Sequence, residues 1–171
     1  MSFLDLVKKR RSCRKYSSQE IALDAIQKCL EAARLAPSAC NCQPWHFIVV
    51  KDKSLKEKLA QAAFSGIHSV SAFAKEAPVL VVVVTEKSSY VTKLGAYLRG
   101  SQFSLIDVGI ACEHFVLQAE EEDLGTCLIG WFNERAVKKV LNLPRNKKID
   151  IIISLGYSRE ESPVTRKRKG I

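Results

Sequence analysis

Residues 101–131, SQFSLIDVGIACEHFVLQAEEEDLGTCLIGW, carry a long apolar pattern that decides the fold. Apolar residues recur at the three- and four-residue spacing of a helix and form two adjacent stripes, so the helix needs two packing partners. One partner is its own sheet. The pattern leaves open whether the second is the same chain or another subunit. The first stripe contains Leu105, Val108, Gly109, Cys112, Phe115, Val116 and Ala119, and the second contains Phe103, Ile106, Ile110 and Leu117.

Few polar residues interrupt this helix before its acidic end at residues 120–122. We expect Asp107, Glu113, His114 and Gln118 to face water. Gly125 is well placed for a left-handed cap that ends the helix, which leaves residues 128–131 in a glycine-punctuated loop.

Three strands and three further helices are predicted around this helix. β-branched and aromatic runs predict strands at 45–50, 79–85 and 148–156, and the second is aliphatic enough to be covered on both faces. Helices are expected from a Ser17/Glu20 capping box to about 35, from a Ser54/Glu57 box to about 63, and from Asn133 to about 141.

These elements predict an α+β (α/β layered) sandwich with a mixed central sheet flanked by helices. The length of 171 residues and the absence of repeats or linkers favour a single domain over residues 1–171. The polar stretch 86–100 is a candidate flap.

Composition indicates a cytoplasmic protein. No apolar run approaches the length of a membrane span, and the N-terminus lacks the pattern of a signal peptide. The six cysteines form no CxxC pair or zinc-site spacing, so most should be reduced and buried, and no metal is assigned. Cys40 and Cys42 form a CxC that could instead bind metal or act as a redox pair.

The net charge of +9 is concentrated near the two ends of the chain. Neither basic cluster has the interleaved aromatic residues that stack on nucleic-acid bases, so we expect no nucleic-acid partner. Because chain termini often lie close together, both clusters could bind one phosphate. A basic anion- or nucleic-acid-binding module without redox activity is the alternative.

Two common classes of enzyme are not supported. No GxG occurs, so the Rossmann fingerprint and the phosphate-binding P-loop are both absent. His46, His68 and His114 show no arrangement with Ser or Cys that would indicate a hydrolase.

Four separated stretches carry a resemblance to a known family. They are RRSCR from Arg10, APSACNCQPW from Ala36, DVGIA from Asp107 followed by LGTCLIG from Leu124, and ISLGY from Ile153. In this order and spacing the chain resembles the nitroreductase family of FMN enzymes over nearly its whole length. The resemblance implies an intertwined homodimer with two FMN sites at the subunit interface.

The resemblance also assigns flavin-binding residues. Arg10, Ser12 and Arg14, with Arg11 adjacent, match positions that hold the phosphate and ribityl chain. A loop that reaches FMN from the partner subunit matches Pro37, Ser38, Ala39 and Asn41. The segment against the isoalloxazine ring matches Leu128, Ile129, Gly130 and Trp131. The C-terminal arginine that completes the phosphate clamp matches Arg166 and, less closely, Arg168.

The implied activity is reduction of electron-poor acceptors, such as nitroaromatics or quinones, by NAD(P)H in a ping-pong cycle. FMN carries the chemistry, so no catalytic side chain is assigned. Dehalogenation, ring oxidation or flavin fragmentation on the same fold are alternatives. Relatives often have glycine where this chain has Trp131, a departure that would narrow the substrate pocket or simply fill core space.

Overall fold

The structure, a computed structural model, describes residues 1–86, 102–160 and 168–170. The candidate flap at 86–100 lies almost entirely outside these residues. The described elements are α1 (Phe3–Lys9), α2 (Leu23–Arg34), η1 (Ala39–Asn41), β1 (Trp45–Val50), α3 (Lys53–Ala63), η2 (Gly66–Glu76), β2 (Val79–Thr85), α5 (Phe103–Glu121), β3 (Gly125–Ile129), α6 (Glu134–Val140) and β4 (Lys148–Gly156).

The four strands form one sheet in the order β1-β2-β4-β3. All three strand pairs are antiparallel, which corrects the expectation of a mixed sheet. Among the described residues, parallel pairing is limited to one isolated bridge between Ser12 and Thr126. The α+β class is confirmed. Strand direction was mispredicted because helices between strands suggest parallel crossovers, whereas these long connections return the chain in the opposite direction.

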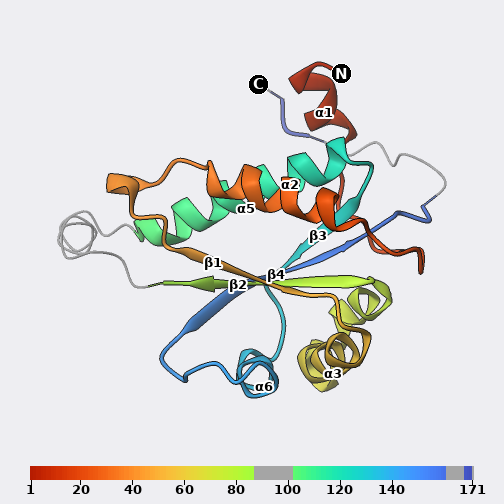
Figure 1. Cartoon of the computed structure of the whole chain (residues 1–171), viewed down its shortest axis with the longest axis vertical. Coiled ribbons are helices and arrows are strands. Elements are labelled where there is room, and N and C mark those ends of the chain that lie inside the picture. The colour runs from red at the N-terminus through yellow and green to blue at the C-terminus, as the bar shows by residue number, and fades with distance from the viewer. Residues whose placement is uncertain (87–101, 161–167, 171) are drawn as a thin grey trace.

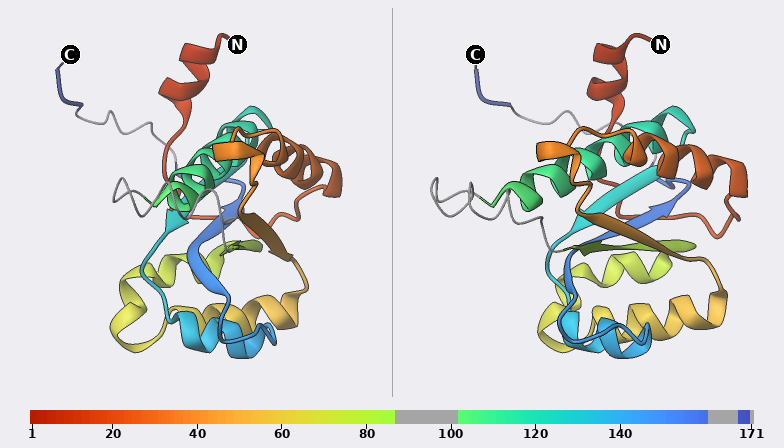
Figure 2. Two further views of the ribbon diagram at one scale, coloured as in Figure 1. Left: turned by 90° about the vertical axis from the view of Figure 1, so that its left-hand side faces the viewer. Right: turned by 60° about the vertical axis from the view of Figure 1, so that its left-hand side comes forward.

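The sheet separates two hydrophobic cores, and helices cover both faces (Figure 1). Alternate residues of β2 face opposite ways: Val81 joins the core under α2 and α5, and Val82 joins the core over α3 and α6. β2 is therefore buried on both faces, as its aliphatic sequence predicts. Figure 2 shows the same layers from two other sides, with α1 standing away from the body.

Helix α5 is the central helix predicted from the sequence. Its first apolar stripe is largely buried against α2 and the sheet, whereas Leu105, Ile106 and Gly109 are exposed in the single chain. Asp107 is buried, with 5% of its surface exposed, although the sequence predicts that it faces water. Its carboxylate has a hydrogen-bond partner in the loop before β1, described below.

Of the three helix starts predicted from capping residues, two differ from the observed caps and one is confirmed. Helix α2 follows Ala22 and has no side-chain cap, because Ser17 instead pairs with the end of the sheet through its backbone. Helix α3 is capped by Asp52, which accepts a hydrogen bond from the Leu55 amide at 2.8 Å, rather than by Ser54. The cap by Asn133 is confirmed, since its side chain accepts from the Ala136 amide.

Strand β3 was not predicted from the sequence. The left-handed residue after α5 is Asp123, with φ of 56°, and Gly125 begins β3 instead of capping the helix. The strand is short, begins with Gly125 and is followed by Gly130, a composition that is typical of a loop. Its pairing with β4, which places Gly125 opposite Gly156, is a tertiary feature.

This glycine pair makes room for the N-terminal segment. A Cβ at Gly125 would lie 2.7 Å from the Cys13 Cβ, and a Cβ at Gly156 would lie 2.6 Å from Pro78 Cδ and 2.9 Å from Tyr16 Cδ1. Tyr16 is 2% exposed, and its hydroxyl lies 2.7 Å from both the Cys13 carbonyl oxygen and Ser154 Oγ. Residues 12–16 therefore lie directly on the end of the sheet.

We expect Gly156→Ala to lower the free energy of unfolding by about 1–3 kcal/mol, the usual cost of overpacking a filled core. The Pro78 and Tyr16 rings cannot both move out of the way. Denaturant unfolding of the flavin-free protein measures this change.

Gly109→Ala is the matched control, because a Cβ there would meet no atom within 4 Å outside its own helix. It should leave stability unchanged or raise it by up to about 1 kcal/mol, since alanine is the better helix former. Equal stability of both variants would contradict the close-packing account.

Candidate functional site

The basic motif 10–14 is fixed beside the start of β3. Ser12 forms the isolated bridge with Thr126, and the Cys13 amide donates to the Thr126 carbonyl oxygen at 2.7 Å. From Thr126 to Gly130 the strand extends roughly 13 Å at 3.3 Å per residue. Two of the four predicted stretches, the basic motif and the 128–131 segment, are therefore brought together within one chain.

The C-terminal segment meets the motif through Glu160. The Glu160 side chain accepts from the Arg14 amide at 2.9 Å and lies 3.7 Å from Arg11 Nε, while its carbonyl oxygen accepts from Arg11 Nη2 at 3.1 Å. The Arg159 amide donates to the Lys15 carbonyl oxygen at 3.0 Å. The chain thus leads toward the basic motif just before the predicted C-terminal arginines. Arg166 lies outside the described residues, and Arg168 is exposed.

Arg10 and Arg14 differ from their neighbours in having no carboxylate partner among the described residues. The Arg14 guanidinium instead lies over the Phe73 ring at 5.7 Å. Nearby, Lys9 pairs with Asp123 at 2.7 Å, and this hydrogen bond raises the Lys9 pKa. Two guanidinium groups that form no ion pair with a described carboxylate fit a phosphate dianion, which they can bind through paired, charge-assisted hydrogen bonds.

An exposed apolar strip continues from this basic motif. Leu128 is the one exposed residue of β3, at 42%, and Trp131 is 56% exposed. Ile129 between them is buried and supports the strip from behind. An aromatic ring system linked to a phosphate would match an apolar strip beside two arginines, so the residues present fit FMN.

The Trp131 side chain is held against η2. Its Nε1 donates to the Ile67 carbonyl oxygen at 3.0 Å, its ring lies 5.2 Å from that of His68, and its carbonyl oxygen accepts from Ser71 Oγ. No functional role was predicted for η2 from the sequence. Because the bond to Ile67 uses a backbone carbonyl, no side-chain motif could have revealed this contact.

The 37–41 loop lies elsewhere, against the N-terminal half of α5. The Ala39 amide donates to Asp107 Oδ1 at 3.1 Å, and Ser38 Oγ accepts from the Gln43 amide at 2.9 Å. Cys40 and Asn41 have positive φ of 52°, a conformation that these bonds help to hold. Pro37 is exposed at the start of this loop.

The loop and the basic motif contact α5 far apart along its length. Asp107 holds the loop, whereas Lys9, next to the motif, pairs with Glu120 at 3.8 Å. Thirteen residues of α-helix span roughly 20 Å. Figure 1 shows η1 and α1 toward opposite ends of α5. One chain therefore does not bring all predicted flavin contacts together.

Residues 1–86, 102–160 and 168–170 contain no group of three His, Cys, Asp or Glu residues that could hold a metal ion. Cys40 and Cys42 are not joined by a disulfide. No helix in the described part of the chain is long and apolar enough to cross a membrane.

The sequence matches the protein family described as "Nitroreductase family" over residues 7–72 and 68–157. The chain belongs to the nitroreductase family. The oxygen-insensitive NADPH nitroreductase of Helicobacter pylori strain 26695 is 30% identical, over 99% of this chain and 97% of that protein. The structure of an FMN-dependent nitroreductase from Clostridium difficile R20291 is 32% identical, with a TM-score of 0.75 over 94% of this chain and 90% of that one.

A relative with another activity is also similar to this chain. The iodotyrosine deiodinase of Thermotoga neapolitana is 28% identical, over 93% of this chain and 90% of that protein. Membership of the nitroreductase family therefore leaves the acceptor to be established from the site.

No role in cofactor binding was predicted for Asp107 from the sequence, and we expect it to position the 37–41 loop for the cofactor. Asp107→Ala removes the acceptor for the Ala39 amide and should weaken FMN binding roughly 5- to 100-fold, the effect of leaving one such group unpaired. Fluorescence titration with FMN measures this affinity.

Asp107→Asn is the matched control, because its side-chain oxygen can still accept from Ala39. It should bind FMN within about threefold of the wild type, since a hydrogen bond to a neutral acceptor retains most of the stabilisation. An Asp107→Ala variant that is folded and binds FMN as tightly as Asp107→Asn would overturn the assignment.

Proposed function

We propose that the protein is an FMN-dependent oxidoreductase that uses NAD(P)H to reduce electron-poor acceptors such as nitroaromatics or quinones. The observation that carries this proposal is the pairing of Ser12 with Thr126, which sets the basic motif beside the exposed strip Leu128–Trp131. The H. pylori and C. difficile relatives, named for NADPH and FMN, support it.

In this proposal, Arg10, Ser12 and Arg14 bind the flavin phosphate and ribityl chain. Arg11, whose guanidinium contacts Glu160, holds the C-terminal segment against the motif. Arg166 and Arg168 follow that segment and complete the clamp. Guanidinium groups suit this role because they fix both the position and the charge of a phosphate.

The 128–131 segment supports and orients the flavin ring. Leu128 and Trp131 provide apolar contact, Ile129 packs behind them, and the backbone amides of Gly130 and Trp131 orient the ring's polar edge. FMN, when bound, supplies the hydride and electron transfer. Reductant and acceptor then occupy the same face in turn, so the chain needs no acid or base side chain.

We further propose a homodimer in which the 37–41 loop of each chain completes the partner's site. The separation of roughly 20 Å along α5 supports this arrangement. So do the exposed apolar residues Phe3 and Leu4 on α1 and Leu105 and Ile106 on α5. We propose one domain over residues 1–171, located in the cytoplasm, where buried thiols such as Cys29 and Cys112 would remain reduced.

Dehalogenation is the second candidate, favoured by the similarity to the Thermotoga deiodinase. Steady-state turnover of NAD(P)H with a quinone, a nitroaromatic and a halogenated phenol separates the two activities. Turnover of the halogenated phenol alone would favour dehalogenation.

We expect the double variant Arg10→Ala/Arg14→Ala to lose bound FMN. Each charge-assisted hydrogen bond contributes about 1.5–3 kcal/mol, so the affinity should fall roughly 100-fold or more. The visible absorption of the purified protein and a titration with FMN measure the loss, and circular dichroism checks the fold.

Lys51→Ala/Lys53→Ala removes the same charge from an exposed site at the start of α3 and should retain FMN. If the arginine variant keeps its yellow colour, the phosphate site lies elsewhere. A wild-type protein that is colourless and does not take up added FMN would contradict the flavoenzyme proposal itself.

A further inference from the structure

A second basic site lies at α6, on the face of the sheet opposite α2 and α5 (Figure 1). Here α6 and the segment after it border an open cavity of about 980 Å³. Of the described residues that line it, four are cationic and one is acidic. These residues are Asn133, Glu134, Arg135, Ala136, Lys138, Lys139, Leu143 and Arg145.

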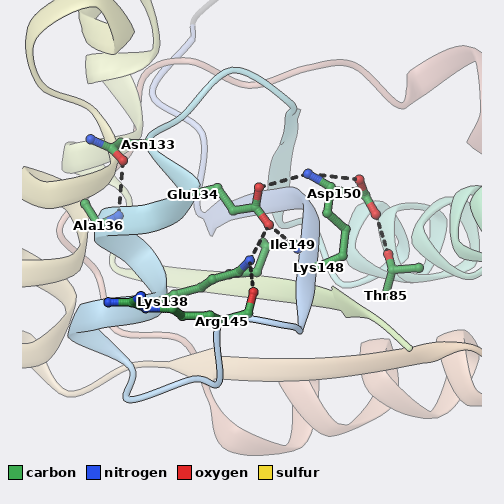
Figure 3. A network of polar contacts seen from close by, with 9 residues as sticks. All are labelled: Thr85, Asn133, Glu134, Ala136, Lys138, Arg145, Lys148, Ile149 and Asp150. Carbon is green, nitrogen blue, oxygen red and sulfur yellow. Dashed lines mark hydrogen bonds and ion pairs between the residues drawn. The ribbon is translucent and has the colours of Figure 1, made fainter. Parts of the chain in front are cut away.

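The single acid of the cavity is already neutralised by the protein (Figure 3). The Glu134 carboxylate pairs with Lys138 at 2.9 Å and with Lys148 at 2.8 Å, and it accepts from the Ile149 amide at 3.0 Å. Burial alone would raise its pKa, but these three donors outweigh burial and lower the pKa to about 2. Glu134 is therefore ionised at neutral pH and already paired with these three donors.

The same lysines also hold the segment after α6 and the start of β4 against α6. Lys138 Nζ also donates to the Arg145 carbonyl oxygen at 3.2 Å, and the Leu143 amide donates to the Lys138 carbonyl oxygen at 2.9 Å. Lys148 ties α6 to the start of β4 through Glu134. The position of Arg145 relative to α6 is thus set before any ligand binds.

Three cations remain available to a ligand. Arg135, Lys139 and Arg145 are exposed and have no carboxylate partner within residues 1–86, 102–160 and 168–170. Elsewhere in the same region, the neighbouring Lys147 pairs with Glu86 at 2.9 Å. The cavity therefore holds positive charge that the described protein does not balance.

We propose that this cavity binds a small ligand that carries two or more phosphate groups. Its volume is in the range of small-molecule sites. Two arginines offer the planar donors that bind phosphate oxygens in pairs. The lining residues that the structure describes include no aromatic one, so the recognised chemistry is phosphate rather than a stacked base.

The phosphates have two possible sources. The cavity begins at Asn133, only two residues after Trp131, which in our proposed function contacts the flavin ring. The phosphates of NADPH could therefore bind here, an assignment that rests on the proposed function. A separate phosphorylated metabolite is the other source and requires no flavin.

Calorimetric titration of FMN-saturated protein with inorganic pyrophosphate tests the proposal, because bound FMN fills the 10–14 motif. Wild type should bind, and Arg135→Ala/Arg145→Ala should reduce the affinity tenfold or more. Lys51→Ala/Lys53→Ala, which removes equal charge elsewhere, should bind as wild type does. Absence of binding by wild type at millimolar pyrophosphate, or equal binding by the Arg135/Arg145 variant, would overturn the proposal.

Two further measurements separate the sources and the two proposals. If the ligand is NADPH, Arg135→Ala/Arg145→Ala raises KM for NADPH, raises KM for NADH less because NADH shares the diphosphate but lacks the 2′-phosphate, and 2′,5′-ADP competes with pyrophosphate. If it is a separate metabolite, both KM values stay unchanged while pyrophosphate affinity still falls. Arg10→Ala/Arg14→Ala should keep the pyrophosphate site without FMN, so failure of the flavin proposal leaves this one testable.

Discussion

The close approach of residues 12–16 to the paired glycines Gly125 and Gly156 is the constraint on which the candidate site depends. Side chains at either glycine would overlap Cys13, Pro78 or Tyr16. Without the space left by the two glycines, the N-terminal segment could not form its bridge to Thr126. The glycine pair therefore places a strongly basic segment at a fixed point on the sheet, where its charge can be used for specific binding.

The same arrangement explains why the site is incomplete in one chain. Helix α5 connects two groups of functional residues, with the basic motif near Glu120 and the 37–41 loop at Asp107. A rigid helix cannot shorten the roughly 20 Å between them. Exposed apolar residues on α1 and α5 offer a surface for a second copy, so α5 serves as core helix and as proposed dimer contact.

Much of this architecture could be predicted from local sequence. The aliphatic run of β2 and the cap at Asn133 were predicted correctly because each depends on neighbouring residues. Strand β3 and the burial of Asp107 were missed because both depend on distant partners, β4 and the Ala39 amide. The contact of η2 with Trp131 through a backbone carbonyl leaves no trace in side-chain identity.

A mixed-dimer experiment tests the two-chain site most directly. One tagged chain carries Arg10→Ala/Arg14→Ala, the other carries Asn41→Trp to block the loop, and the mixed dimer is isolated through both tags. A site shared between chains predicts no FMN in either parent and one FMN per mixed dimer, because one motif and the partner's loop are intact. A colourless mixed dimer, or an Asn41→Trp parent that retains FMN, would contradict the account.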